Sequence, residues 1–266
     1  MWIGGTMTVP GVSGGSMAMI LGVYDRLISS VSSFFKNPGK SMSFLVRFVL
    51  GAGVGMVLFS RFISFLFTTR ADVPLRFFFL GAVAGGIPLI CRQAQVKKIT
   101  WQALLWPLAG LLMVYGLAAL PEGLFTAGLP GAASSPGVPS FRALLFQFLG
   151  GCILAVALIL PGISVSQMLL MLGLYEPVME AVSSLRFASL LPLGLGAVLC
   201  TLLVTRLLGS AMQRRPQPTY LLILGFVLGS LGELYPGLPE GWNLLFAPLA
   251  AVAGYQLLSR LSRRAE

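Results

Sequence analysis

Long apolar runs separated by short polar segments dominate the chain. The clearest are residues 44–67, 100–120 and 187–209. A helix needs roughly 20 apolar residues to cross the hydrocarbon core of a bilayer. These runs therefore predict membrane-spanning helices in an all-α polytopic membrane protein.

A repeat divides this pattern into two similar halves. Residues 10–25, PGVSGGSMAMILGVYD, and residues 161–176, PGISVSQMLLMLGLYE, are identical at seven of sixteen positions. Chance gives about one identity at ordinary residue frequencies. Weaker matches continue in order, pairing Arg61 with Arg206, Pro74 with Pro218, and 107–109 with 248–250.

The repeat predicts two units, 1–120 and 143–266. A Pro/Gly/Ser-rich linker, 121–142, lies between them and is expected outside the cytoplasm. Each unit has a segment broken at Pro-Gly, followed by three apolar helices. The second copy has an apolar arm, 141–160, before its break. The first copy has only nine residues there, so we expect its arm to be short or truncated.

The broken segment either crosses the membrane once, which makes the copies parallel, or returns as a re-entrant hairpin, which inverts them. The crossing arrangement divides the loop Lys and Arg residues eight to eight, which gives no orientation. The hairpin arrangement leaves only Arg70, Arg76, Arg142 and Arg186 on the outer side, against twelve on the inner side. Six of the eight acidic residues also fall on the outer side. Because cytoplasmic loops carry the excess of Lys and Arg, this bias favours inverted repeats with both termini cytoplasmic.

Composition narrows the class of protein. The chain is 56% hydrophobic and only 10% charged, whereas soluble domains carry about 25% charged residues. The net charge of +10 is explained by cytoplasmic loops, so no nucleic-acid partner is expected. The chain contains no histidine, which removes most acid–base and metal schemes. No Walker-type loop is present, so we expect no ATP, no cofactor, no metal and no catalytic residues.

The two breaks are the predicted binding site. Pro10-Gly11 and Pro161-Gly162 are expected to end one half-helix, since proline lacks an amide donor and glycine tolerates unusual dihedral angles. Small and hydroxyl residues then form the N-terminal end of the next half-helix, where free amides and the helix dipole favour an anion such as phosphate. These residues are Ser13, Gly14, Gly15 and Ser16 in the first copy, and Ser164, Ser166 and Gln167 in the second. Alternatively, the small residues only allow close helix packing.

Four charged residues complete the candidate set. Arg61 and Arg206 lie inside apolar helices, where charge is costly and usually functional, and arginine suits phosphate. Alternatively, each arginine reaches the membrane surface from a position near its helix end. Asp25 and Glu176 follow tyrosines that we expect to close the half-helices near the membrane surface. They are candidates for carrying a coupling proton or sodium ion, although a solvated role is the simpler interpretation.

The segment PGVSGGSMAMILGVYDRLI and its weaker echo PGISVSQMLLMLGLYEPVM resemble the PopT-type polyprenyl-phosphate transporters, a prokaryotic membrane family formerly known only as a domain of unknown function. The resemblance covers essentially the whole chain. It implies a flippase in the cytoplasmic membrane that returns undecaprenyl phosphate, the lipid carrier of cell-wall synthesis, to the inner leaflet. The short N-terminal arm departs from the family pattern, and the second copy lacks the double glycine.

Two other functions remain open from the residues alone. One is an ion-coupled transporter of a small soluble anion, and the other is a non-transporting scaffold for envelope assembly. An enzyme acting on lipid phosphates would need a nucleophile beside a base, and the sequence offers no such pair.

Overall fold

The computed structural model describes residues 2–6, 14–69, 71–95, 101–121 and 141–264, and these ranges contain helices but no strands. The elements of the first half are α1 Trp2–Thr6, α2 Gly14–Ile20, α3 Tyr24–Ser32, α4 Pro38–Phe67, α5 Asp72–Gln93 and α6 Trp101–Ala118. Those of the second half are α7 Phe141–Ile159, α8 Val165–Met171, α9 Tyr175–Ser183, the 3-10 helix η1 Phe187–Leu190, α10 Leu191–Arg214, α11 Pro216–Leu234 and α12 Asn243–Arg264. The predicted linker 121–142 lies almost wholly outside the described residues.

Five segments in the described part of the chain are long and apolar enough to cross a membrane. They are Pro38–Ile63, Asp72–Gln93, Phe141–Ile159, Phe187–Arg214 and Asn243–Leu261. Their outer faces carry large apolar side chains, such as Leu50 and Val57 on α4 and Leu203 on α10, which are exposed in the isolated chain. A lipid environment accounts for such faces. The predicted all-α polytopic class is therefore confirmed.

The long helices pack in pairs that often join the two halves of the chain. Helix α5 lies against α12, and α11 lies against α6, whereas α7 lies against α10 within the second half. Glycines make these approaches close, because a Cβ atom on Gly81 would collide with the carbonyl of Ala251, and one on Gly225 with the carbonyl of Pro107. Small residues at contacts of this kind are typical of membrane helix bundles.

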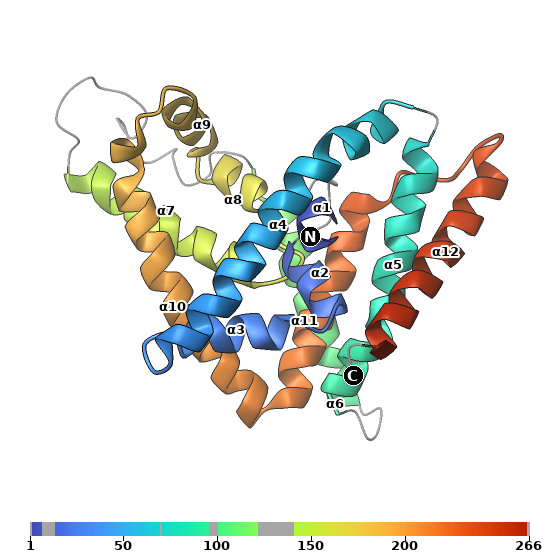
Figure 1. The fold of residues 1–266 in the computed structure, drawn as a ribbon, viewed down its shortest axis with the longest axis horizontal. Coiled ribbons are helices and arrows are strands. Elements are labelled where there is room, and N and C mark those ends of the chain that lie inside the picture. The colour runs from blue at the N-terminus through green and yellow to red at the C-terminus, as the bar shows by residue number, and fades with distance from the viewer. Residues whose placement is uncertain (1, 7–13, 70, 96–100, 122–140, 265–266) are drawn as a thin grey trace.

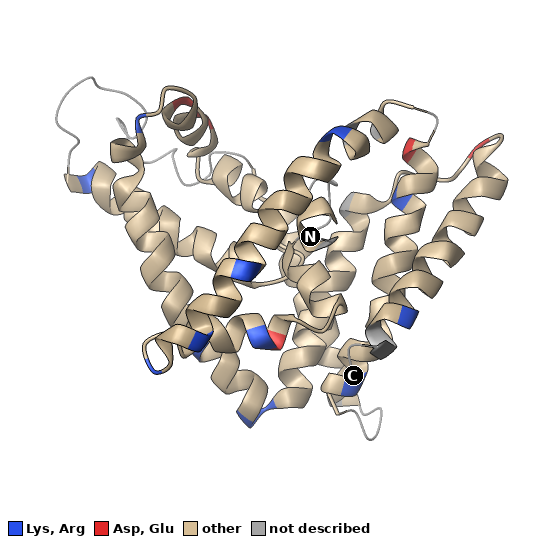
Figure 2. Cartoon of the chain, viewed as in Figure 1, with Lys and Arg blue, Asp and Glu red and all other residues tan. Residues whose placement is uncertain are grey.

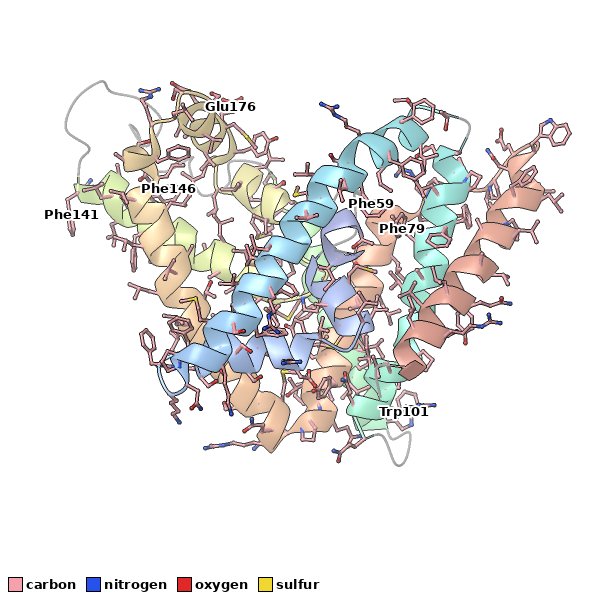
Figure 3. The ribbon with its side chains drawn as sticks, in the orientation of Figure 1. Phe59, Phe79, Trp101, Phe141, Phe146 and Glu176 are labelled. Carbon is pink, nitrogen blue, oxygen red and sulfur yellow. The ribbon has the colours of Figure 1, made fainter. Side chains whose placement is uncertain are left out.

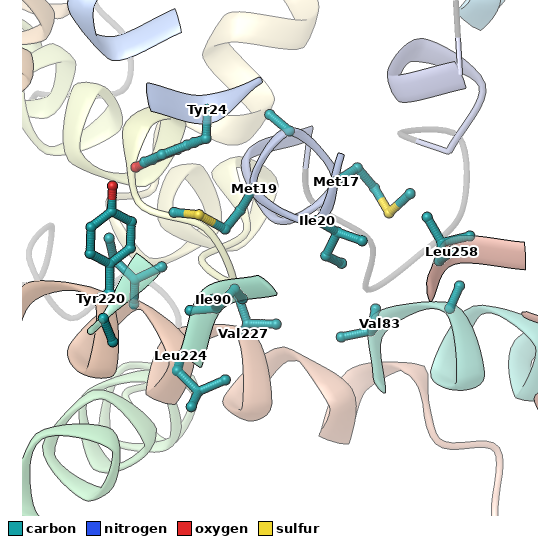
Figure 4. Close-up of a cluster of buried hydrophobic side chains, with 14 of the residues drawn as sticks. Met17, Met19, Ile20, Tyr24, Val83, Ile90, Tyr220, Leu224, Val227 and Leu258 are labelled. Atoms are coloured by element: carbon teal, nitrogen blue, oxygen red, sulfur yellow. The ribbon is translucent and has the colours of Figure 1, made fainter. Parts of the chain in front are cut away.

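Figure 1 shows two arms that meet at a narrower end. One arm holds α7, α9 and α10, and the other holds α5 and α12. Helix α4 runs diagonally from near the narrow end to the top of the second arm, and α3 lies with the start of α11 at the narrow end. Helix α2 lies at the centre, where five of its seven residues, 16–20, are buried. Figure 4 shows side chains of α2 packed against α5 and α11. The cluster includes Met17, Met19 and Ile20 of α2, Val83 and Ile90 of α5, and Leu224 and Val227 of α11. Helix α2, the described part of the first broken segment, therefore lies in the core.

Candidate substrate site at the broken segments

The Leu-Gly-x-Tyr part of the repeated motif forms the same turn in both copies. Gly22 and Gly173 have positive φ angles of 70° and 62°, a conformation that glycine adopts without steric cost. The Val23 amide donates to the Ala18 carbonyl over 2.9 Å, and the Leu174 amide to the Leu169 carbonyl over 2.8 Å. A glycine in this geometry with such a bond is a Schellman helix end.

This turn corrects one sequence prediction. Tyr24 and Tyr175 were expected to close the half-helices, but each begins a new helix, α3 or α9. The half-helices α2 and α8 have only seven residues each. The sequence does not show this boundary, because the run MAMILGVY is apolar throughout.

The second break lies where the sequence predicts it. Helix α7 ends at Ile159, and Gly162 follows with φ 84°. A Cβ atom at Gly162 would collide with the carbonyl of Phe226 on α11, so the chain can turn here only with glycine. Ser164 then caps α8 by accepting a hydrogen bond from the Gln167 amide, 3.4 Å away. Pro10, Gly11 and Ser13 of the first break lie outside the described residues.

The two repeated segments touch each other. A Cβ atom built on Gly15 would lie 3.2 Å from Cα of Pro161, so the opening of α2 lies directly against the second break. The Tyr24 hydroxyl donates to the Ile159 carbonyl over 2.7 Å. That carbonyl is at the end of α7, where the break removes its partner within the helix. Tyr24 is 1% exposed, so it is a buried structural link between the two repeated segments.

The predicted binding residues differ in accessibility. Gly14, Gly15, Ser164 and Gln167 are partly buried, and Ser166 is exposed on α8. Ser16 is 1% exposed and lies in the packed core. The described residues at the two breaks are therefore brought together, but their hydroxyls do not all face one space.

Asp25 is held by two side chains that the sequence did not single out. The Tyr220 hydroxyl donates to its Oδ2 over 2.7 Å, and the Gln93 amide group donates to the same oxygen over 3.4 Å. Its other oxygen, Oδ1, is buried and has no hydrogen-bond partner among the described residues. Burial raises the pKa of the Asp25 carboxyl above its ordinary value, although the bond from Tyr220 lowers it in part. Helix α3, which carries Asp25, is too short to span a membrane.

The two arginines and the two acids are not equivalent. Arg206 lines a cavity of about 440 Å³ between α3, α10 and α11, together with Asp25, Lys36 and Tyr220. Its Nε donates to the Ser32 carbonyl over 3.4 Å. Arg61 is exposed on α4 and does not line that cavity. Glu176 is exposed at the start of α9 (Figure 3).

A second, apolar cavity lies beside the first broken segment. It has a volume of about 220 Å³ and lies between α1, α4, α5 and α12. Met17 and Leu21 border it on the side of α2, and Phe59 and Phe79 border it on α4 and α5 (Figure 3). The cavity is suited to hydrocarbon and not to an anion, because almost every side chain that lines it is apolar.

Comparison with known proteins identifies relatives across most of this structure. Residues 3–241 match the family model described as VCA0040-like, undecaprenyl phosphate translocase-like. A polyprenyl-phosphate transporter of Vibrio cholerae is 30% identical over 251 residues, which cover 88% of this chain and 75% of the relative. A polyprenyl-phosphate transporter of Staphylococcus aureus is 30% identical over 264 residues, which cover 96% of this chain and 91% of the relative. No solved structure matches. The family match includes both copies of the repeated segment.

Proposed function

The chain belongs to the undecaprenyl phosphate translocase-like family, a family of transporters and not of enzymes, and we propose that it carries a polyprenyl phosphate from the outer to the inner leaflet of a prokaryotic cytoplasmic membrane. Undecaprenyl phosphate, used in envelope polymer synthesis, is the expected substrate. The observation that carries the proposal is the contact between the two broken segments, Gly15 against Pro161. Irregular backbone at membrane depth is tolerated where it lines a cavity or is buried in protein, and transporters place their sites there.

The proposal includes two inverted repeats with re-entrant hairpins, 1–120 and 143–266, joined by the linker 121–142. Reciprocal packing supports it, since α1 lies on α4 as α7 lies on α10, and α5 pairs with α12 as α11 pairs with α6. Helices exchanged in this way are expected when two copies are related by a two-fold axis. Inverted repeats allow one binding site to face either side of the membrane in turn.

The proposed orientation places both termini in the cytoplasm. Figure 2 shows acidic residues mainly at the end that carries α9 and the starts of α5 and α12, which would be the outer end. Basic residues that we assign to the inner side include Lys36, Lys40, Arg214 and Arg215 around α3, α4 and the α10–α11 junction. This distribution supports the assignment by the positive-inside rule.

In the proposed site, the phosphate binds to amides and hydroxyls around residues 13–16 and 164–167, and Arg61 or Arg206 neutralises part of its charge. The partial exposure of Gly14 and Gln167 and the exposure of Ser166 support this position. The tail remains in lipid through a lateral opening. The apolar cavity next to Met17 would hold the isoprene units nearest the phosphate.

Asp25 is the better placed of the two proposed coupling residues. Its carboxyl is partly buried, bonded to Tyr220 and Gln93, and has a raised pKa, which suits a group that binds and releases a proton. Glu176 is exposed in this state. We therefore assign a coupling proton to Asp25 first and to Glu176 only in a state where it is covered.

The test is made with purified protein in liposomes that initially carry undecaprenyl phosphate in both leaflets. A membrane-impermeant phosphatase added outside hydrolyses only the accessible headgroups, so empty liposomes keep about half of the lipid protected. Active protein should expose the protected half and allow complete hydrolysis. Phosphatidic acid, which has a phosphate on a diacyl tail, tests recognition of the polyprenyl chain.

Labelled inorganic phosphate in the same liposomes separates the remaining functions. Uptake of phosphate without lipid movement would support the transporter of a small soluble anion. Movement of neither substrate, by protein that is folded and inserted, would support the scaffold. Loss of lipid movement in Ser166→Ala/Arg206→Ala protein that keeps its thermal stability would support the proposed site.

A further inference from the structure

One side of the molecule is held together by contacts between α3 and its neighbours. Helix α3 lies against α10, and its first and last turns are both bonded. At the first turn Tyr220 donates to Asp25 over 2.7 Å. At the last turn Arg206 donates to the Ser32 carbonyl over 3.4 Å. These two bonds close the α3 side of the cavity between α3, α10 and α11.

The repeat gives each of these four residues a counterpart. Glu176 corresponds to Asp25, and Ser183 corresponds to Ser32, because α9 (175–183) aligns with α3 (24–32). Arg61 corresponds to Arg206. The match of Pro74 and Leu80 with Pro218 and Leu224 places Arg76 opposite Tyr220. A polar side chain able to bond the acid is therefore present in both copies.

The counterparts are apart in this structure. Glu176 is exposed, and α9 contacts α8 and η1. Arg76 instead forms an ion pair with Asp72 on its own helix, with 2.9 Å between Nε and Oδ1. Figure 1 shows α9 in one arm of the molecule and the start of α5 in the other. The side that carries α9 is thus open where the side that carries α3 is closed.

We infer that Arg76 and Glu176 form an ion pair that closes the α9 side in the opposite state of transport, as Tyr220 and Asp25 close the α3 side in this one. Helix α9 then lies across α4, and Arg61 bonds the Ser183 carbonyl. This inference rests on the proposed function and its inverted repeats. It adds Arg76, which neither the motif nor the cavity singles out.

The chemistry of the pair fits a temporary contact. Arginine and a carboxylate form two parallel hydrogen bonds of fixed geometry, so they align two helices as they meet. An exposed ion pair is a weak interaction, so the contact can open again. Asp72 keeps Arg76 oriented while Glu176 is away, and it would compete with Glu176 for the same guanidinium.

Cross-linking tests whether the two residues meet. Cys91, Cys152 and Cys200 are first replaced by alanine, and Arg76→Cys is then combined with Glu176→Cys. The side chains of an arginine–glutamate pair can meet while their Cα atoms are too far apart for a direct disulfide. A bifunctional methanethiosulfonate whose spacer matches the length of such a pair should therefore cross-link the two cysteines in membranes, block their labelling by a maleimide reagent and stop lipid movement until the cross-link is reduced. Arg76→Cys with Arg142→Cys is the matched control, because Arg142, in the first turn of α7, lies in the same arm as Glu176 but outside the inferred contact, so this pair should not cross-link.

Charge reversal tests whether the contact matters without a cross-link. Arg76→Glu and Glu176→Arg should each slow lipid movement by about tenfold, within the range of coupling energies measured between contacting residues. The double variant should recover most of the rate. Asp72→Asn should not slow it, because that carboxylate holds Arg76 only in the open state. Equal loss in the single and double variants would overturn the ion pair.

The outcomes separate this inference from the proposed function. If the unmodified protein moves undecaprenyl phosphate but the 76/176 pair never cross-links, the ion pair is wrong and the transport function stands. A cross-linked protein that still moves lipid also overturns it. If the unmodified protein moves no polyprenyl phosphate, the proposed function fails first, and the inference fails with it.

Discussion

The helix pairs α2–α3 and α8–α9 have similar sequences and the same local turn, but they lie in different surroundings. Tyr24 is buried and bonded to Ile159, whereas Tyr175 is half-buried. Asp25 is bonded to Tyr220, whereas Glu176 is exposed. The difference teaches that the motif specifies the turn, while packing against the rest of the chain decides which of the two pairs is enclosed.

This asymmetry is informative because the sequence alone does not require it. A duplicated segment with two identical environments would give a symmetric structure. Here α3 lies on α10, and α9 lies on η1 and α8. A protein that uses such a pair for transport would exchange these environments.

The largest expected loss of stability is at Gly162, in the break that precedes the second helix pair. Gly162→Ala adds a Cβ atom that collides with the Phe226 carbonyl, at a residue with φ 84°. The strained φ and the overpacking each cost about 1–3 kcal/mol, so we expect a loss of several °C or failure to fold. Gly194→Ala on α10 is the control, because a Cβ atom there meets nothing within 4 Å. Thermal unfolding in detergent measures both variants. Equal stability of the two would contradict the close contact assigned to Gly162.

The next largest effect is a difference in stability between variants of Tyr24 and Tyr175. Tyr24→Phe leaves the Ile159 carbonyl buried without its donor, which costs about 1–3 kcal/mol. Tyr175→Phe in the second pair should change stability by less than about 0.5 kcal/mol, as expected away from buried hydrogen bonds. The same thermal assay compares them. Similar losses would mean that the two pairs have equivalent environments in solution, which would remove the asymmetry.

Sequence reasoning predicted the features that depend on local or compositional rules. The all-α membrane class followed from apolar length, and the break before Ser164 followed from Pro161-Gly162. It missed the boundary at Gly22, because the apolar run continues through a turn that only backbone hydrogen bonds reveal. It also missed Tyr220 and Gln93 as partners of Asp25, since residues 195 and 68 positions away share no sequence pattern with it. The candidate site was thus predicted at the motif and not at its tertiary partners.

A smaller effect tests what the two pairs have in common. Gly22→Ala and Gly173→Ala both force a residue with a side chain into a left-handed conformation, at φ 70° and 62°. Each should cost about 1–2 kcal/mol, the usual penalty for L-residues in that region. The two losses should agree within error in thermal unfolding, although the surroundings of α3 and α9 differ. A loss at only one glycine would show that the turn is not equally required in both copies.

The smallest effect is expected at the N-terminal end of α8, where helix capping and phosphate binding predict different results. Ser164→Ala removes the cap on the Gln167 amide, which costs about 0.5–1 kcal/mol. Ser166→Ala should leave stability unchanged or raise it slightly, because Ser166 is exposed and alanine favours helix. If Ser166 also binds the headgroup, its variant will need more undecaprenyl phosphate for half-maximal lipid movement while its melting temperature stays the same. If only Ser164→Ala weakens transport, and only as far as its lost stability explains, these hydroxyls support the helix and the phosphate is bound elsewhere.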